Sequence, residues 1–239
     1  MKVVISQPMY FPWVGMLEQI ALADVYIHYS DVQFSKGSFT NRVQIKTDRG
    51  IKWLTVPLDR MKLGQKINEV LINNSVNWQA DHIRQLTAAY HACPFFEEVV
   101  KTVNHVFEKD FFTIDKVSEK SVEAVSAYFG LTDGCRFVHS TDLGVSGSGS
   151  RRVLDLVHAV GGTEYITGHG ARNYLDHHQF DLEGVTVSYM DYRKEPYNQL
   201  HGPFTPFVSA LDLIANKGKD GRAFICSGSR YWKDFLSHE

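Results

Sequence analysis

Short apolar segments alternate with helical stretches along this chain, and this alternation constrains the fold more than any other feature. The strand-like segments are Lys2–Ser6, Val25–Tyr29, Arg136–His139, Glu164–Thr167 and Val185–Met190. Between the first two, Leu17, Ile20 and Ala21 form one apolar stripe of a short helix. Strands that alternate with helices pair in parallel and are covered by those helices. We therefore predict one α/β domain over residues 1–239, with a mostly parallel sheet and flanking helices.

Two regions interrupt this alternation. Residues 41–57 read as a β-hairpin, because Asp48-Arg49-Gly50 separates two strand-like runs and its glycine accepts a positive φ. Residues 77–130 show helical periodicity, with Asn77 as a cap at the start and Gly130 at the end. We expect this block to form a helical layer on the domain or an insertion into it.

Composition excludes several classes of protein. The chain of 239 residues has a formal net charge of −2, which gives no whole-molecule attraction to nucleic acid. No apolar run approaches the roughly 20 residues of a membrane span, and the first residues lack a secretory pattern. The three cysteines lie far apart, so we expect reduced thiols and a cytoplasmic protein. His177 and His178 are adjacent and cannot easily face one ion, so no metal site is predicted.

Polar and aromatic residues gather after the first two strands. Residues 7–15 read Gln-Pro-Met-Tyr-Phe-Pro-Trp-Val-Gly, in which two prolines stiffen a backbone that presents large aromatic rings. Ligands of open α/β sheets bind at the carboxyl ends of the strands. The candidate site residues in this part of the chain are Gln7, Tyr10, Trp13, Asp31, Gln33, Lys36, Asn41 and Arg42.

Several of these residues have alternative roles. Tyr10 and Trp13 either stack on a flat ligand or fill the core. Asp31 and Lys36 are either a catalytic base with an electrostatic stabiliser or an ion pair that anchors the loop. Arg42 suits a phosphate or carboxylate through its planar fork.

A serine-glycine loop with two arginines lies after the strand at residues 136–139. Residues 146–152 read Ser-Gly-Ser-Gly-Ser-Arg-Arg, and they open a predicted helix. Free amides and guanidinium groups at a helix start fit a phosphate, with Ser148, Ser150, Arg151 and Arg152 as candidate ligands. The alternative is a solvated loop with surface arginines. The loop lacks the Gly-Lys-Ser/Thr ending of a Walker motif.

Gly168-His169-Gly170 follows the strand-like segment that ends at Thr167. The glycines allow a ligand to approach the backbone, and His169 is able to contact a phosphate or move a proton. Glycines at a tight strand exit need no ligand, however, which is the alternative explanation.

Several motifs resemble the WbqC-like protein family. They are Gln-Pro-x-Tyr-x-Pro-Trp-x-Gly at 7–15, Asp-Val-Gln-Phe-x-Lys at 31–36, Phe-x-Asn-Arg at 39–42, Trp-Leu-Thr-Val-Pro at 53–57, Tyr-Ile-Thr-Gly at 165–168 and Asn-Tyr-Leu-Asp at 173–176. The resemblance implies a bacterial role in surface glycans of the O-antigen type and adds Asn173 to the candidate residues. Position 6 is often histidine in that family, whereas this chain has Ser6, which shifts the role of base to Asp31 or His169.

These expectations favour an enzyme that attaches an acyl or aminoacyl group to the amino group of a nucleotide-linked sugar. Asp31 or His169 would take the proton, while Lys36 and Arg42 would steady negative charge. The donor is open between an acyl carrier such as CoA and ATP activation, and the oligomeric state is open as well. The alternatives are a non-catalytic subunit that binds nucleotide sugars or glycans, and an adenylating ligase, whose paired-histidine signature is missing.

Overall fold

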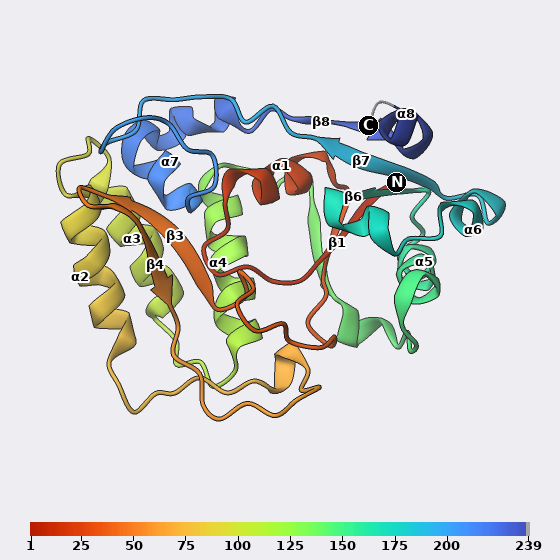
Figure 1. The fold of residues 1–239 in the computed structure, drawn as a ribbon, viewed down its shortest axis with the longest axis horizontal. Helices are drawn as coiled ribbons and strands as arrows, with labels where there is room; N and C mark the ends of the chain where they lie inside the picture. The colour runs from red at the N-terminus through yellow and green to blue at the C-terminus, as the bar shows by residue number, and fades with distance from the viewer. Residues whose placement is uncertain (238–239) are drawn as a thin grey trace.

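The computed structural model describes residues 1–237 and contains a six-stranded sheet beside a separate two-stranded hairpin (Figure 1). The strand order is β5 (Arg136–His139), β2 (Val25–His28), β1 (Lys2–Ser6), β6 (Glu164–Thr167), β7 (Thr186–Asp191) and β8 (Gly228–Tyr231). All neighbouring strands run parallel except β7 and β8. The predicted mostly parallel sheet is confirmed.

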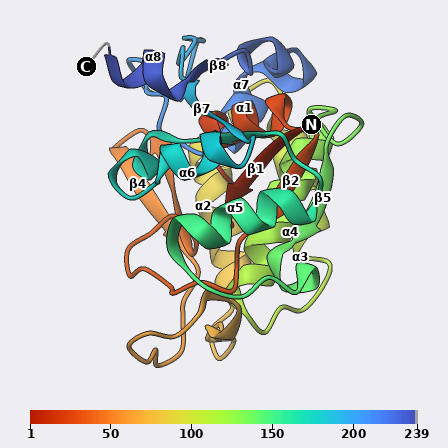
Figure 2. The ribbon, with the colours of Figure 1, turned by 90° about the vertical axis from the view of Figure 1, so that its right-hand side faces the viewer.

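The sheet is buried on both faces, which explains its nearly continuous apolar strands. Val4 of β1 faces α1 (Val14–Leu22) and α4 (Ile114–Tyr128) in one core cluster. Val3 and Ile5 face α5 (Gly149–Ala159) in a second cluster. That second cluster also contains Phe180 of α6 (His177–Leu182) and Trp232 of α8 (Trp232–Ser237). Figure 2 shows α5 lying across the strands of this face.

The hairpin and the helical block both form as predicted. β3 (Arg42–Thr47) and β4 (Gly50–Thr55) pair antiparallel around Asp48 and Arg49, and Gly50 has a φ of 99°. The block comprises α2 (Trp78–Tyr90), α3 (Phe96–Phe107) and α4, and the Asn77 side chain accepts the Ala80 N–H at the start of α2. In Figure 1 the hairpin lies against this block together with α7 (Ala210–Lys217). Within residues 1–237, no helix has both the length and the apolarity that a membrane crossing requires.

Candidate active site at the switch point of the sheet

The strand order reverses its direction at β1, which makes this strand the switch point of the sheet. β2 and β5 lie on one side of β1, while β6, β7 and β8 lie on the other. The segments that follow β1 and β6 therefore run in opposite directions across the sheet. A cavity of about 680 Å³ opens between the carboxyl ends of these two strands. This is the position at which open α/β sheets bind ligands. Gln7 follows β1 and Gly168 follows β6, and both line the cavity.

One wall of the cavity is aromatic. The Trp13 ring centroid lies 5.2 Å from that of Tyr192 and 6.0 Å from that of Phe207. Gly15 makes this arrangement possible, because a Cβ there would come within 2.2 Å of the Trp13 Cη2 atom. Half of the Phe207 side chain is exposed. The wall therefore offers flat apolar surface to a planar ring or to the apolar face of a sugar.

The phenol of Tyr192 lies beside the carboxyl end of β6. The Gln19 amide donates to the Tyr192 hydroxyl over 2.9 Å. Burial raises the pKa of Tyr192 to about 12, and the Gln19 hydrogen bond offsets only part of that effect. Tyr192 is thus protonated at neutral pH and its O–H is a hydrogen-bond donor. Gly168 lies close by, since a Cβ on it would be 3.3 Å from the Tyr192 oxygen.

His169 is held in one orientation at the cavity. Its Nε2 lies 2.7 Å from the Met190 carbonyl oxygen, which only accepts, so Nε2 carries the hydrogen. Its ring centroid lies 5.3 Å from that of Tyr192 and 4.8 Å from that of Phe235. The neutral ring therefore keeps its lone pair on Nδ1. Within residues 1–237 the structure shows no hydrogen bond to Nδ1, and a histidine with a fixed tautomer and such a nitrogen is suited to take a proton.

The long connection from β7 to α7 supplies the rest of the wall. It carries Tyr192, Lys194 and Phe207, and Lys194 has a φ of 52°, a strained conformation for a residue other than glycine. The Lys194 ammonium lies 5.2 Å from the Phe207 ring centroid. This places a cation at the rim of the cavity, beside the aromatic wall.

A buried lysine anchors the middle of this connection. The Lys46 ammonium, on β3, donates to Gln199 Oε1 at 3.0 Å, to the Gly202 carbonyl at 2.9 Å and to the Pro203 carbonyl at 2.6 Å. All three of its hydrogens are thus used on one loop. The hairpin therefore helps to position the cavity wall, because Lys46 holds the connection that carries it.

The structure brings only part of the predicted site to the cavity. Five of the predicted residues line it, namely Gln7, Trp13, Gly168, His169 and Gly170. Tyr10 lies elsewhere, because it is 1% exposed and its hydroxyl is 2.8 Å from His82 Nδ1 in the helical block. Asn173 ends the short 3-10 helix that begins at His169 and is exposed outside the cavity.

Asp31 forms an ion pair instead of facing the cavity. Its carboxylate binds the Arg152 guanidinium and accepts the Ser140 hydroxyl over 2.6 Å. Burial raises the pKa of Asp31, but the bonds from Ser140 and Arg152 outweigh it and hold the pKa below its usual value. A carboxylate that is ionised so readily is a weak base. Of the two roles weighed for Asp31, the structure corresponds to the anchor, although its partner is Arg152 and not Lys36.

The two arginines of the predicted phosphate loop form ion pairs with nearby carboxylates. Arg152 is 5% exposed, and its guanidinium carbon lies 5.0 Å from the ring centroid of Tyr29, which lines the cavity. Arg151 pairs with Glu183 and, at 2.7 Å, with Asp155. These ion pairs contradict the expectation that the two guanidinium groups are free for a phosphate, because each already has a carboxylate partner.

The serines of that loop also lie outside the cavity lining. The Ser150 hydroxyl accepts the Asp176 N–H over 2.6 Å and thereby joins α5 to α6. Ser148 is exposed and makes no side-chain cap on α5.

The four candidate residues that follow Asp31, as far as the start of the hairpin, also lie outside the cavity lining. Gln33 and Lys36 line a separate groove formed with residues 61–65. Asn41 is buried and donates to the Val56 carbonyl over 3.1 Å. Arg42 donates to the Gly37 carbonyl and lies 4.2 Å from the Trp53 ring centroid. These four side chains shape the loop and the hairpin in this structure.

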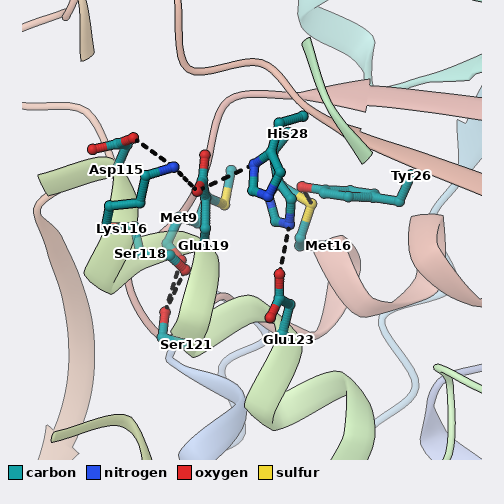
Figure 3. A network of polar contacts seen from close by, with 11 residues as sticks. Met9, Met16, Tyr26, His28, Asp115, Lys116, Ser118, Glu119, Ser121 and Glu123 are labelled. Atoms are coloured by element: carbon teal, nitrogen blue, oxygen red, sulfur yellow. Dashed lines mark hydrogen bonds and ion pairs between the residues drawn. The ribbon is translucent and has the colours of Figure 1, made fainter. Parts of the chain in front are cut away.

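Charged side chains cluster close to Met9 and Met16, two residues of the cavity lining (Figure 3). The Ser121 hydroxyl of α4 lies 3.2 Å from the Met9 carbonyl oxygen. His28, fully buried at the end of β2, lies 3.5 Å from Glu123. Burial raises the pKa of Glu123, but His28, together with the charges of Lys120 and His139, outweighs this effect, so that the pKa lies below its usual value.

A second part of this cluster surrounds Glu119. Its carboxylate is 3.1 Å from the Lys116 ammonium and 3.4 Å from His139 Nδ1, and Lys116 also reaches Asp115 at 3.3 Å. Among residues 1–237, no group of three or more histidine, cysteine and acidic side chains is arranged to hold a metal ion. The cluster binds α4 to the carboxyl ends of β2 and β5.

Sequence reasoning missed several residues of the cavity. They are Gln19, Tyr29, Thr167, Tyr174, Lys194 and Phe207. Tyr29 and Thr167 end or directly follow strands whose carboxyl edge was already predicted to bind, and that edge was the available signal. Nothing in the local sequence around Phe207 points to β1, because that contact depends on the path of the long loop.

Comparison with known proteins gives the family. The model of the WbqC-like protein family matches residues 7–224. The chain is 33% identical over 227 residues to the uncharacterized protein Rv1507c of Mycobacterium tuberculosis, covering 94% of this chain and 97% of the relative. No solved structure matches the chain. The chain therefore belongs to the WbqC-like protein family.

Proposed function

We propose that the chain is an enzyme that binds a nucleotide-linked amino sugar in the switch-point cavity and transfers an acyl or aminoacyl group to its amine. The aromatic wall of Trp13, Tyr192 and Phe207 supports this proposal, because it fits a base or the apolar face of a sugar. The cavity volume of about 680 Å³ is in the range of small-molecule sites.

The observation that carries the catalytic part is the fixed tautomer of His169. In the reaction, the amine nitrogen attacks the acyl carbonyl carbon and forms a C–N bond. His169 Nδ1 accepts the proton that the nitrogen loses, while the bond from the acyl carbon to its carrier breaks. The proton then passes to the leaving thiolate of a carrier such as CoA, or to its counterpart in an ATP-activated donor. Tyr192, protonated through its raised pKa, is placed to donate to oxygen on the ligand.

A non-catalytic subunit that binds nucleotide sugars is the second candidate. The placement of Asp31 and Lys36 favours it, since two of the three predicted catalytic side chains do not line the cavity. The two candidates differ in turnover, not in binding.

A binding panel followed by turnover assays tests both. UDP-linked and dTDP-linked amino sugars, acyl-CoA thioesters and ATP are screened by thermal shift, and ligands that bind are combined to detect acylated sugar by mass spectrometry. We expect His169→Gln to retain sugar affinity and to lose 10²-fold or more of the rate, in the range of general base catalysis. The control is His105→Gln, because His105 is exposed on α3 and lies outside the cavity. Binding without turnover in the wild type would support the second candidate, and no binding at all would overturn both.

A further inference from the structure

The connection between β4 and α2 carries an exposed apolar tip. Leu63 is fully exposed, Met61 is 39% exposed, and both line a surface groove with Leu71, which is 50% exposed. Phe112, 74% exposed, lies beside Leu71, because its carbonyl accepts the Ile72 N–H over 2.8 Å. Three large apolar side chains thus line one groove, with Phe112 beside Leu71, on a loop that Figures 1 and 2 both show projecting from the body of the protein.

Basic side chains surround this tip. Arg60 and Lys62 flank Met61, and Lys36 lines the groove shared with Leu63. With Lys66 there are four cations, and none of them forms an ion pair with another residue in 1–237. Two acidic residues of the same loop, Asp59 and Glu69, reduce the local charge to +2, against −2 for the whole chain.

We propose that this tip, residues 59–71 with Lys36 and Phe112, docks on the surface of an anionic lipid bilayer. The apolar side chains are exposed on a projecting loop, so they are able to enter the boundary between headgroups and acyl chains. Long basic side chains beside them reach the lipid phosphates while their stems stay in apolar surroundings. This surface is separate from the switch-point cavity and does not rest on the proposed function.

Leu182 is a matched control for the exposure of Leu63. Leu182 is 87% exposed on α6, but it lies between Asp181 and Glu183, whereas Leu63 follows Lys62. The two leucines thus match in exposure and differ in the charge beside them. An anionic bilayer attracts the first surface and gains no such attraction at the second, where Glu183 pairs with Arg151 and Asp181 with Lys233.

The experiment is sedimentation of the whole protein with vesicles of phosphatidylcholine, with and without phosphatidylglycerol. We expect the wild type to bind anionic vesicles, with an affinity that falls as salt is added, and to bind neutral vesicles weakly. Leu63→Ser should weaken binding about tenfold, and Lys62→Glu with Lys66→Glu should weaken it at least as much. Leu182→Ser should leave it unchanged. Thermal unfolding checks folding, and Leu63→Ser should not shift it, because that side chain is solvated.

Three results would overturn the inference. They are wild-type protein that stays in the supernatant with both kinds of vesicle, equal losses in Leu63→Ser and Leu182→Ser, and concentration-dependent dimerisation that Leu63→Ser abolishes without vesicle binding. The last result would assign the tip to a second copy of the chain.

Discussion

Asp212 makes the stability of this protein depend on pH in a direction that can be calculated. Its side chain is fully buried at the start of α7, where it accepts the Tyr197 hydroxyl over 2.9 Å and the Asn216 amide over 3.3 Å. Burial raises the pKa of Asp212 from 3.8 to about 6, and hydrogen bonds and the charge of Lys46 offset only part of that rise. Through Tyr197, this carboxyl also supports the loop that carries the cavity wall.

The sign follows from the two pKa values. Between pH 4 and 6 the unfolded chain loses this proton before the folded chain does, so the folded state loses stability as the pH rises. At 1.36 kcal/mol per pH unit, the difference between 3.8 and about 6 corresponds to about 3 kcal/mol. Asparagine carries no charge at any pH. Asp212→Asn should therefore be more stable than the wild type by up to about 3 kcal/mol at pH 7.5, and equal to it near pH 4.

Urea unfolding followed by tryptophan fluorescence between pH 4 and 8 measures this difference. Thermal unfolding is a second measurement: for a chain of this size, a difference of 3 kcal/mol corresponds to a shift of about 6 to 12 °C in Tm. Asp48→Asn is the control, since Asp48 is exposed in the hairpin turn. A variant at Asp212 that is less stable than the wild type at pH 7.5, or whose advantage does not change with pH, would refute the reasoning.

Three further substitutions test the anchors of the site. Asp31→Asn leaves the buried Arg152 charge without its partner and should cost about 3 kcal/mol at neutral pH by chemical denaturation, a loss that shrinks as the pH falls below 4. An Asp31→Asn protein as stable as the wild type at pH 7 would contradict the anchor role. Gly15→Ala should displace the Trp13 indole and weaken ligand binding about tenfold by calorimetry, and unchanged affinity would show that Trp13 does not contact the ligand. Lys46→Met removes three part-buried hydrogen bonds to the β7–α7 connection, although Gln199 Oε1 keeps the Thr205 N–H, and should lower both Tm and ligand affinity. A lower Tm with full affinity would show that this connection does not position the cavity wall.

The sheet was predictable because its strands are short, apolar and separated by helical periodicity. The exception is β8, whose four residues, Gly228–Tyr231, have little apolar character and pair only with the last parallel strand. Its place depends on a contact over a long stretch of chain, which local patterns do not encode.

The candidate site was predictable only where a strand end fixes the direction of a side chain. Trp13 and His169 lie near the ends of β1 and β6, and both reach the cavity. Asp31 and Lys36 follow β2 in a loop whose path the sequence does not define, and they point to Arg152 and to the outer groove. Phe207 comes from a long loop that Lys46 holds in place, so neither its position nor its partners follow from neighbouring residues.

The central claim is that the cavity between β1 and β6 holds the substrate. A crystal structure of the protein with a bound nucleoside diphosphate amino sugar tests it most directly. We predict that the ligand contacts Trp13 and Phe207, with its amine within hydrogen-bond reach of His169 Nδ1. A ligand bound instead in the groove beside Lys36, or on the serine-glycine loop with the Arg151 and Arg152 ion pairs broken, would contradict the account.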